Sequence, residues 1–208
     1  MYLKIGHLVP ATVIKALPEH DAYLMAIANS EIMALLPKDH AGRTMRVGDC
    51  TAATVHAIKG AHVFLTQRTA VFYRRLLEMI LSPLLMDGKL QVRHAAAIHG
   101  TGFAKVSIEG MNGCNPILES MPYIRGTKVY TQDTVTLIAF SSNIEEYIKN
   151  SLGPAPREHI QKVIYNEEAE EYTVSVTSAQ AGVFFGRRGM NVAMAAKLTG
   201  VKINVVPV

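Results

Sequence analysis

The sequence contains little cysteine, no tryptophan and no long apolar run. Its two cysteines, Cys50 and Cys114, are too few for a disulfide scaffold, and we interpret both as reduced thiols. No stretch approaches the roughly 20 apolar residues that a membrane span requires, because the richest one, residues 76–86, is interrupted by Glu78 and Pro83. The amino terminus also lacks the continuous apolar core of a signal peptide. We therefore expect a cytoplasmic protein that makes no membrane contact.

Motifs for catalysis and cofactor binding are missing as well. The sequence has no Walker phosphate-binding loop, no G-x-S-x-G nucleophile turn and no dinucleotide-binding glycine pattern. Its 8 histidines show neither H-x-x-x-H nor H-E-x-x-H spacing. The acidic run at residues 167–171 lacks the fixed ligand geometry of a metal site, and we interpret it as a solvated hairpin tip. We expect no enzyme, no catalytic residue, no metal site, no cofactor and no small-molecule substrate.

What the chain does contain is apolar material for a core and a mild excess of positive charge. Apolar residues make up 49% of the 208 residues, and charged residues make up 18%. The formal net charge of +4 suits a polyanionic partner without requiring one. The length permits one domain of ordinary size or several very small ones.

The first part of the chain has the pattern of short strands. Five β-rich runs separated by Pro, Asp, Asn and Gly lie at residues 8–17, 22–28, 31–37, 49–58 and 61–67. So many short strands in so short a segment predict a small closed barrel, since closure removes exposed sheet edges.

The remainder shows the order helix, strand, strand, helix, loop, helix, strand twice. The first copy begins with a helix at 69–81 that Ser82-Pro83 ends, and the second begins with a helix at 143–152. In the second copy we expect strands at 159–166, 171–178 and 201–208, a short helix within 178–185, and a helix at 191–199 capped by Gly200. The duplication predicts two α/β units after the barrel.

One loop of the second copy carries the strongest functional signal. Gly186, Arg187, Arg188 and Gly189, which we call the GRRG loop, lie between two predicted helices. Two glycines allow close approach of the backbone to a ligand, the next helix directs free N–H groups at the loop, and two arginines suit phosphate. This combination predicts the backbone clamp of a KH domain. The alternative, a tight helix–helix connection with solvated arginines, does not explain why both intervening residues are basic. We interpret the preceding apolar run, residues 183–185, as core rather than base-stacking surface.

The first copy has a degenerate equivalent, residues 123–126, which we call the YIRG segment. It keeps the second glycine, Gly126, and one arginine, Arg125, but not the first glycine. We expect it to be a loop with weaker binding or a mainly structural role. Arg125, Gly126 and Lys128 remain candidates for electrostatic contact with RNA.

The barrel offers weaker candidates. Tyr23 lies on an alternating strand, and two interpretations stay open: a stacking face for a base or a core position. Lys38, His40, Arg43 and Arg46 form a loose basic cluster that is either a binding surface or a solvated loop. From this region Tyr23, Lys38 and Arg43 are retained as candidate RNA contacts.

The chain resembles the RNA-binding core of the bacterial transcription termination/antitermination factor NusA. The resemblance is carried by G-x-x-G-x-N-V at residues 186–192, by L-T-G at 198–200, and in the barrel by L-P-K at 36–38, V-G-D at 47–49 and L-T-Q-R at 65–68. It implies a multidomain β plus α/β protein: an S1 (OB-fold) barrel at 1–68, a degenerate type II KH domain at 69–142 and an intact one at 143–208. Two departures are a missing counterpart of the polymerase-binding N-terminal domain and the shortened first KH loop.

The resemblance also implies a function. A NusA-like protein binds nascent single-stranded RNA and takes part in transcription elongation, termination or antitermination, with RNA polymerase as a further candidate partner. Phosphate contacts would fall on the GRRG loop, with Asn191 and Lys197 in support. The missing polymerase-binding domain favours an alternative, an RNA chaperone or ribosome-assembly factor that uses the same modules.

Overall fold

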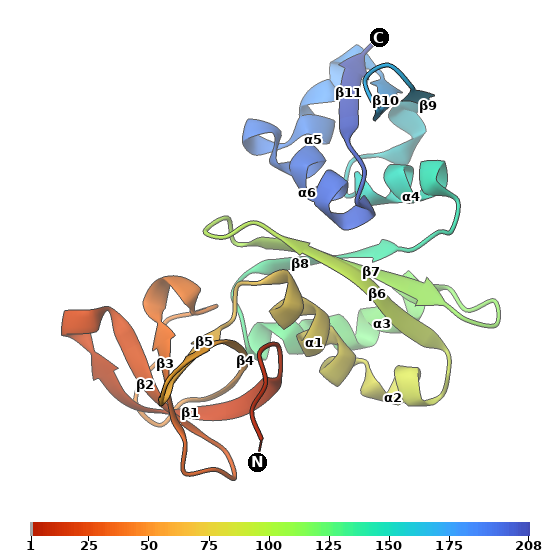
Figure 1. Cartoon of the computed structure of the whole chain (residues 1–208). Helices are drawn as coiled ribbons and strands as arrows, with labels where there is room; N and C mark the ends of the chain where they lie inside the picture. Colours follow the sequence, from red (N-terminus) through yellow and green to blue (C-terminus); the bar gives the residue numbers. More distant parts are fainter. Residues whose placement is uncertain (1) are drawn as a thin grey trace. The chain divides into compact units, whose positions relative to one another are not determined.

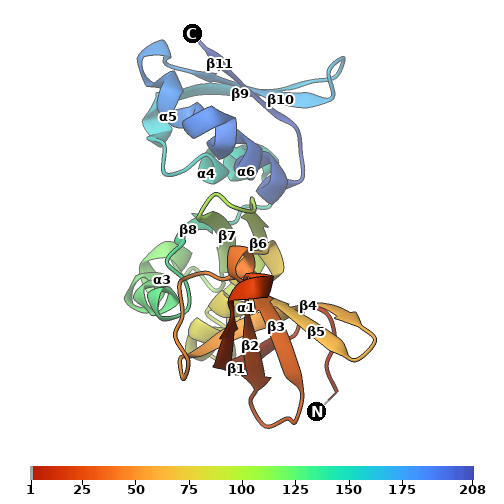
Figure 2. The same cartoon turned by 90° about the vertical axis from the view of Figure 1, so that its left-hand side faces the viewer.

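The structure, a computed structural model, describes residues 2–208 (Figures 1 and 2). The chain folds into two compact units. Unit 1 consists of Met1–Pro83, Ala97–Phe103 and Ser120–Val135, and unit 2 consists of Leu84–Ala96, Ala104–Glu119 and Thr136–Val208. The segment 69–142, predicted as one domain, contributes residues to both units. Within residues 2–208, no helix is long and apolar enough to span a membrane.

The first five strands close into a barrel, as predicted. They are β1 (Leu8–Leu17), β2 (Ala22–Ile27), β3 (Met33–Pro37), β4 (Cys50–Lys59) and β5 (His62–Thr66), in the order β1-β2-β3-β5-β4. Strand β1 runs antiparallel to β2 and β4, and β3 pairs in parallel with β5. Alternation along β1 places Val9, Ala11 and Val13 in the core, because successive strand residues face opposite sides.

Helix α1 (Ala70–Ile80) follows the barrel where the sequence predicts it. Thr69 caps its first turn, since the Thr69 hydroxyl accepts a hydrogen bond from the Phe72 N–H at 3.2 Å. Leu76 and Leu77 are fully buried one turn after Phe72 and Tyr73, the spacing of an apolar helix face. Ser82-Pro83 ends α1, and a separate short helix, α2 (Ser82–Met86), starts there.

The first α/β copy is only partly as predicted. Strands β6 (Leu90–Ala97), β7 (Phe103–Gly110) and β8 (Thr134–Ala139) form a sheet in that order. Helix α3 (Pro116–Ile124) leads directly into a 3₁₀ helix, Arg125–Val129. The predicted α-helix between the loop and the last strand is therefore reduced to this 3₁₀ helix.

The second copy is complete. It contains α4 (Ile144–Ser151), β9 (Ile160–Asn166), β10 (Glu171–Val176), α5 (Ala181–Phe185), α6 (Met190–Thr199) and β11 (Ile203–Pro207). Its sheet has the order β11-β10-β9, with β10 parallel to β11 and antiparallel to β9. Helices α4, α5 and α6 bury Ile148, Phe184 and Ala195 in the core of this copy. Gly200 ends α6 in the left-handed conformation, as predicted. The barrel and the α/β copies confirm the predicted fold class.

Candidate nucleic-acid interface

Gly186 begins the GRRG loop with a backbone that only glycine adopts readily. Its φ is 68° and its ψ is 177°, and its N–H closes helix α5 on the Gly182 carbonyl at 2.9 Å. A Cβ at this position would lie 2.9 Å from the Asn191 Cβ and 3.1 Å from the Asn191 nitrogen. Both the positive φ and the close approach of α6 therefore require glycine here.

The rest of the loop turns the chain into α6. Arg187–Gly189 is a 3₁₀ turn in which Arg188 has a left-handed backbone (φ 54°, ψ 35°), and Gly189 (φ 72°) is the N-cap of α6. A left-handed conformation costs a residue with a Cβ about 1–2 kcal/mol. Such strain is typical of functional sites, where the surrounding structure imposes it.

The two arginines of the loop carry uncompensated charge. Arg187 and Arg188 are both exposed, and neither forms an ion pair with any residue from 2 to 208. Over the same described range, no side chain caps the first turn of α6, whose N-cap is a glycine. The loop thus combines two guanidinium groups with the positive end of a helix dipole. Lys197 is exposed too, but it lies in the last turn of α6, most of a helix length away from the loop.

Asn191 supports the loop from the protein side. Its Nδ2 donates to the Leu152 carbonyl at 2.8 Å and to the Phe184 carbonyl at 2.9 Å, while its Oδ1 accepts from the Lys105 ammonium. Both amide protons are therefore used within the fold. This side chain ties the start of α6 to the ends of α4 and α5, which makes Asn191 a positioning residue. Its supporting contact with RNA stays a prediction.

Lys105, in β7, is a site residue that sequence reasoning missed. It is 4% exposed, and its Nζ donates to the Ser151 carbonyl at 2.5 Å as well as to Asn191. Burial lowers the pKa of the Lys105 ammonium to about 8. The strand alternates, with Lys105, Ser107 and Glu109 at its polar positions, so the pattern predicts a solvent-facing lysine. Nothing local identifies a partner 86 residues further along the chain.

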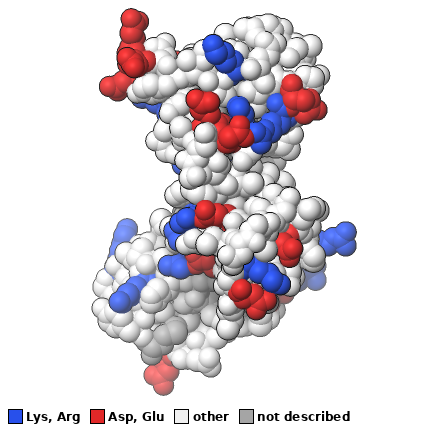
Figure 3. Space-filling model, turned by 90° about the vertical axis from the view of Figure 1, so that its right-hand side faces the viewer, with Lys and Arg blue, Asp and Glu red and all other residues white. Residues whose placement is uncertain are grey.

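Charge elsewhere on the surface is mixed. On the face shown in Figure 3, Lys and Arg side chains are interspersed with Asp and Glu side chains. With a net charge of only +4, a preference for a polyanion has to come from a local arrangement such as the GRRG loop and not from a broad field.

Comparisons with known proteins agree with this geometry. A family model described as the NusA-like second KH domain matches residues 144–208. The transcription termination/antitermination protein NusA of Rickettsia prowazekii is 25% identical over 188 residues, which cover 85% of this chain. The proteins of that name from Halalkalibacterium halodurans and Bacillus subtilis are each 28% identical over 153 residues, or 71% of this chain.

The chain is NusA-like. The match to R. prowazekii NusA covers 37% of that protein, and the other two matches cover 39% and 40% of theirs. The chain thus spans well under half the length of these relatives, and the similarity includes both the barrel and the KH segments.

The first KH copy of this NusA-like chain does not form the loop predicted for it. Tyr123 and Ile124 belong to α3, and Gly126 has an ordinary helical backbone inside the 3₁₀ helix. A Cβ on Gly126 would make normal contact with Ile80, at 3.6–3.9 Å. Backbone hydrogen bonds continue the helical conformation, for example from the Tyr130 N–H to the Thr127 carbonyl at 3.0 Å. The prediction of a loop at the YIRG segment is wrong because the chain stays helical.

The basic residues of this segment have different environments. Lys128 donates from its Nζ to the carbonyls of Gln132 and Asp133, at 3.1 and 3.0 Å. Its ammonium is therefore engaged in holding the chain that leads into β8. Arg125 is exposed. A role for Arg125, Gly126 and Lys128 in RNA binding stays a prediction.

In the barrel, the structure favours the core interpretation of Tyr23. Its side chain is 4% exposed, and its hydroxyl accepts a hydrogen bond from the Met45 N–H at 3.2 Å. The buried ring is therefore closed to stacking against a base. Tyr23, Lys38 and Arg43 do line one surface pocket of about 280 Å³, together with Arg68 and Gln132.

The basic residues around this pocket are paired with carboxylates. Lys38 contacts Asp21 at 2.7 Å, and this hydrogen bond raises the pKa of the Lys38 ammonium. Arg43 contacts Asp49 at 3.1 Å. A backbone N–H donated by Arg46 lowers the pKa of the Asp49 carboxyl. The pocket is consequently less positive than the number of its basic residues suggests, in contrast to the GRRG loop.

Proposed function

We propose that this chain binds single-stranded RNA, with the GRRG loop as the clamp on the phosphate backbone. The observation that carries the proposal is the conformation of that loop. Two exposed arginines, without ion-pair partners among the described residues, lie between two glycines of positive φ at the glycine-capped start of α6. Guanidinium donors next to the positive end of a helix favour a phosphate oxygen.

Apolar side chains beside the loop support contact with bases. Phe184 is fully buried, as its core interpretation requires, but Val183 and Phe185 are 49% and 36% exposed. The core interpretation therefore holds for one residue of the run only. Bases of a clamped strand would rest on apolar side chains such as these, since stacking tolerates many base identities.

The binding experiment uses the full chain and a mixed-sequence single-stranded RNA longer than the roughly four nucleotides that a KH loop clamps. Replacing both arginines, Arg187→Asp with Arg188→Asp, is expected to weaken binding by roughly 100-fold at low salt, because two charge-assisted contacts become repulsive. In a plot of the logarithm of the affinity against the logarithm of the salt concentration, the slope should become shallower by roughly 1.4, which is about 0.7 for each lost phosphate contact. Unchanged affinity and slope would reject the clamp.

For the cellular role, we infer participation in transcription elongation, termination or antitermination, with nascent RNA and RNA polymerase as partners. The support is the likeness to proteins named as transcription termination/antitermination factors over 71–85% of this chain. Recovery of RNA polymerase with the tagged chain from a native extract tests this role. Co-sedimentation with ribosomal particles and not with polymerase would instead favour the RNA chaperone or ribosome-assembly role.

A further inference from the structure

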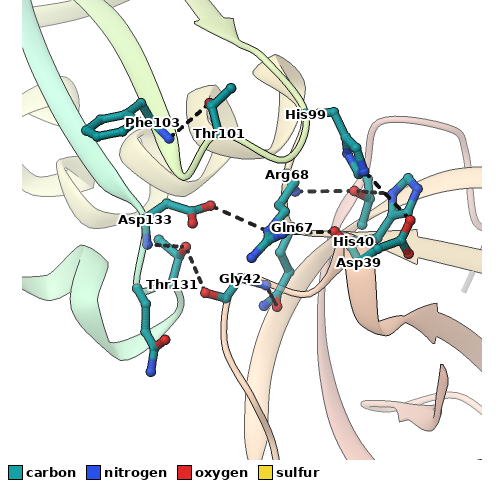
Figure 4. A network of polar contacts seen from close by, with 12 residues as sticks. Asp39, His40, Gly42, Gln67, Arg68, His99, Thr101, Phe103, Thr131 and Asp133 are labelled. Atoms are coloured by element: carbon teal, nitrogen blue, oxygen red, sulfur yellow. Dashed lines mark hydrogen bonds and ion pairs between the residues drawn. The ribbon is translucent and has the colours of Figure 1, made fainter. Parts of the chain in front are cut away.

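Three side chains with metal-ligating atoms meet in unit 1 (Figure 4), whereas the GRRG loop belongs to unit 2. Asp39 and His40 lie in the 3₁₀ turn after β3, and His99 lies in the hairpin between β6 and β7. One ligand atom from each of the three falls within 4.8 Å of the others. His99 Nε2 and Asp39 Oδ2 are 3.7 Å apart.

The His40 ring is held in place by a hydrogen bond within the barrel. Its Nδ1 shares a hydrogen bond with the Thr66 hydroxyl at 3.0 Å, and the His56 ring lies 5.3 Å from it, centroid to centroid. The His99 ring lies 4.8 Å away on the same measure. Metal-binding histidines almost always hydrogen-bond through the nitrogen that does not ligate, which fixes the ring orientation. If Nδ1 keeps its hydrogen bond to Thr66, ligation falls to Nε2.

The charges around the cluster are compatible with an ion. Arg68, the nearby fixed cation, is partly compensated: its Nη1 donates to the Asp39 carbonyl at 3.1 Å, and its Nε lies 3.8 Å from an Asp133 carboxylate oxygen.

We propose that Asp39, His40 and His99 form a binding site for Zn²⁺ or a similar first-row divalent ion. Two imidazoles and one carboxylate suit Zn²⁺, Co²⁺ or Ni²⁺, whereas Mg²⁺ and Ca²⁺ prefer oxygen ligands alone. Ligand bonds of about 2.0–2.2 Å require the three atoms to draw together. Asp39 and His99 can do so because their side chains are 63% and 51% exposed. Bound metal would join the β6–β7 hairpin to the turn after β3, as a cross-link within unit 1.

The site was invisible to spacing rules because its ligands are not at motif distances along the chain. Two are adjacent and the third is 59 positions later in the sequence. Only the packing of the hairpin beside the turn brings them together. The proposal is independent of RNA binding, since none of its residues belongs to the GRRG loop.

The test is calorimetric titration of the full chain, without an affinity tag, with ZnCl₂, together with visible absorption on adding CoCl₂. We expect one site, and His40→Ala, His99→Ala and Asp39→Ala should each weaken Zn²⁺ binding at least about 10-fold, the lower end of what the loss of a supporting group costs. His62→Ala, which removes an exposed histidine of β5 outside the cluster, is the matched control and should bind as the parent chain does.

A second readout excludes a mere folding defect. Zn²⁺ should raise the Tm of the parent chain and of His62→Ala, because a ligand that binds only the folded state stabilises it. It should leave the Tm of His99→Ala unchanged while circular dichroism shows that variant folded. Absence of Zn²⁺ binding by the parent chain, or equal binding by His62→Ala and His99→Ala, would overturn the proposal.

Discussion

The GRRG loop and the YIRG segment occupy corresponding places in the two α/β copies, yet their backbones differ completely. In the second copy α5 stops at Gly186, the chain reverses through three residues of positive φ, and a new helix starts. In the first copy the helix α3 passes into a 3₁₀ helix without such a reversal. The arginine and the second glycine are present in both.

The residue at the first position, Gly186 in one segment and Tyr123 in the other, accounts for the difference between the two backbones. A Cβ at position 186 would collide with the start of α6, whereas the corresponding position, Tyr123, carries a full side chain within α3. A basic residue next to one glycine is therefore not a phosphate clamp by itself.

The largest expected change in stability comes from adding a methyl group at Gly186, and the same addition at Gly126 is its comparison. Gly186→Ala should lower the free energy of unfolding by about 2–4 kcal/mol, through the positive φ and the contact with Asn191. Gly126→Ala should be neutral or stabilising by up to about 1 kcal/mol, because its backbone is helical. Urea denaturation measures both. Equal losses in the two variants would remove the conformational distinction between the copies.

A lysine ammonium donates hydrogen bonds near each segment: Lys105 beside the GRRG loop and Lys128 beside the YIRG segment. Lys105→Met leaves the Ser151 carbonyl and Asn191 Oδ1 without their buried donor, and should destabilise the chain by about 1–3 kcal/mol. Lys128→Met removes an exposed lysine and should change stability by less than about 0.5 kcal/mol. Thermal unfolding followed by circular dichroism distinguishes the two. A loss at Lys128 as large as that at Lys105 would mean that the first copy depends on a comparable anchor.

Because the pKa of Lys105 is lowered in the folded chain, this residue makes the free energy of unfolding depend on pH. Between about pH 8 and its ordinary pKa of 10.5, the unfolded chain holds a proton on Lys105 that the folded chain has released. Stability contributed by this group therefore rises with pH across that window and is absent below it. A lowering from 10.5 to about 8 corresponds to a gain of at most roughly 3 kcal/mol across the window, at about 1.4 kcal/mol for each pKa unit. Denaturation of the parent chain and of Lys105→Met at several pH values isolates the effect, because all other titrating groups are shared. If the free energy of unfolding changed with pH in the same way in the parent chain and in Lys105→Met, the expected role of Lys105 would be contradicted.

The smallest expected change in stability comes from Arg188→Gly, which removes backbone strain and one guanidinium group from the GRRG loop. Arg188→Gly should stabilise the fold by about 0.5–1 kcal/mol, because glycine adopts the left-handed backbone without the Cβ penalty. The same variant should bind RNA more weakly, since one guanidinium is lost. Arg125→Gly serves as the matched change in the YIRG segment and should gain no stability, because its backbone is helical. Weaker binding together with lower stability in Arg188→Gly would show that the arginine is held there for the fold and not for a ligand.

Local patterns predicted the barrel, the second KH copy and the GRRG loop, because alternation, helical spacing and glycine positions are short-range signals. The YIRG segment was mispredicted as a loop, since its helical continuation depends on hydrogen bonds such as that of Thr127, which spacing does not reveal. Tyr23 and Asn191 were selected as candidate RNA contacts, but the sequence did not reveal their hydrogen-bond partners, which lie far along the chain: Met45 for Tyr23, and Leu152 and Lys105 for Asn191. Lys105 and the Asp39–His40–His99 cluster could not be predicted because they exist only through tertiary packing.

The most direct test of the central claim is a nitrogen–proton correlation spectrum of the full chain, recorded during titration with single-stranded RNA. Because both segments are present in one molecule, each serves as the control for the other. If the GRRG loop clamps RNA, the backbone amide signals of residues 186–192 shift strongly, while those of residues 123–128 stay in place. Shifts confined to residues 123–128, or equal shifts in both segments, would contradict it.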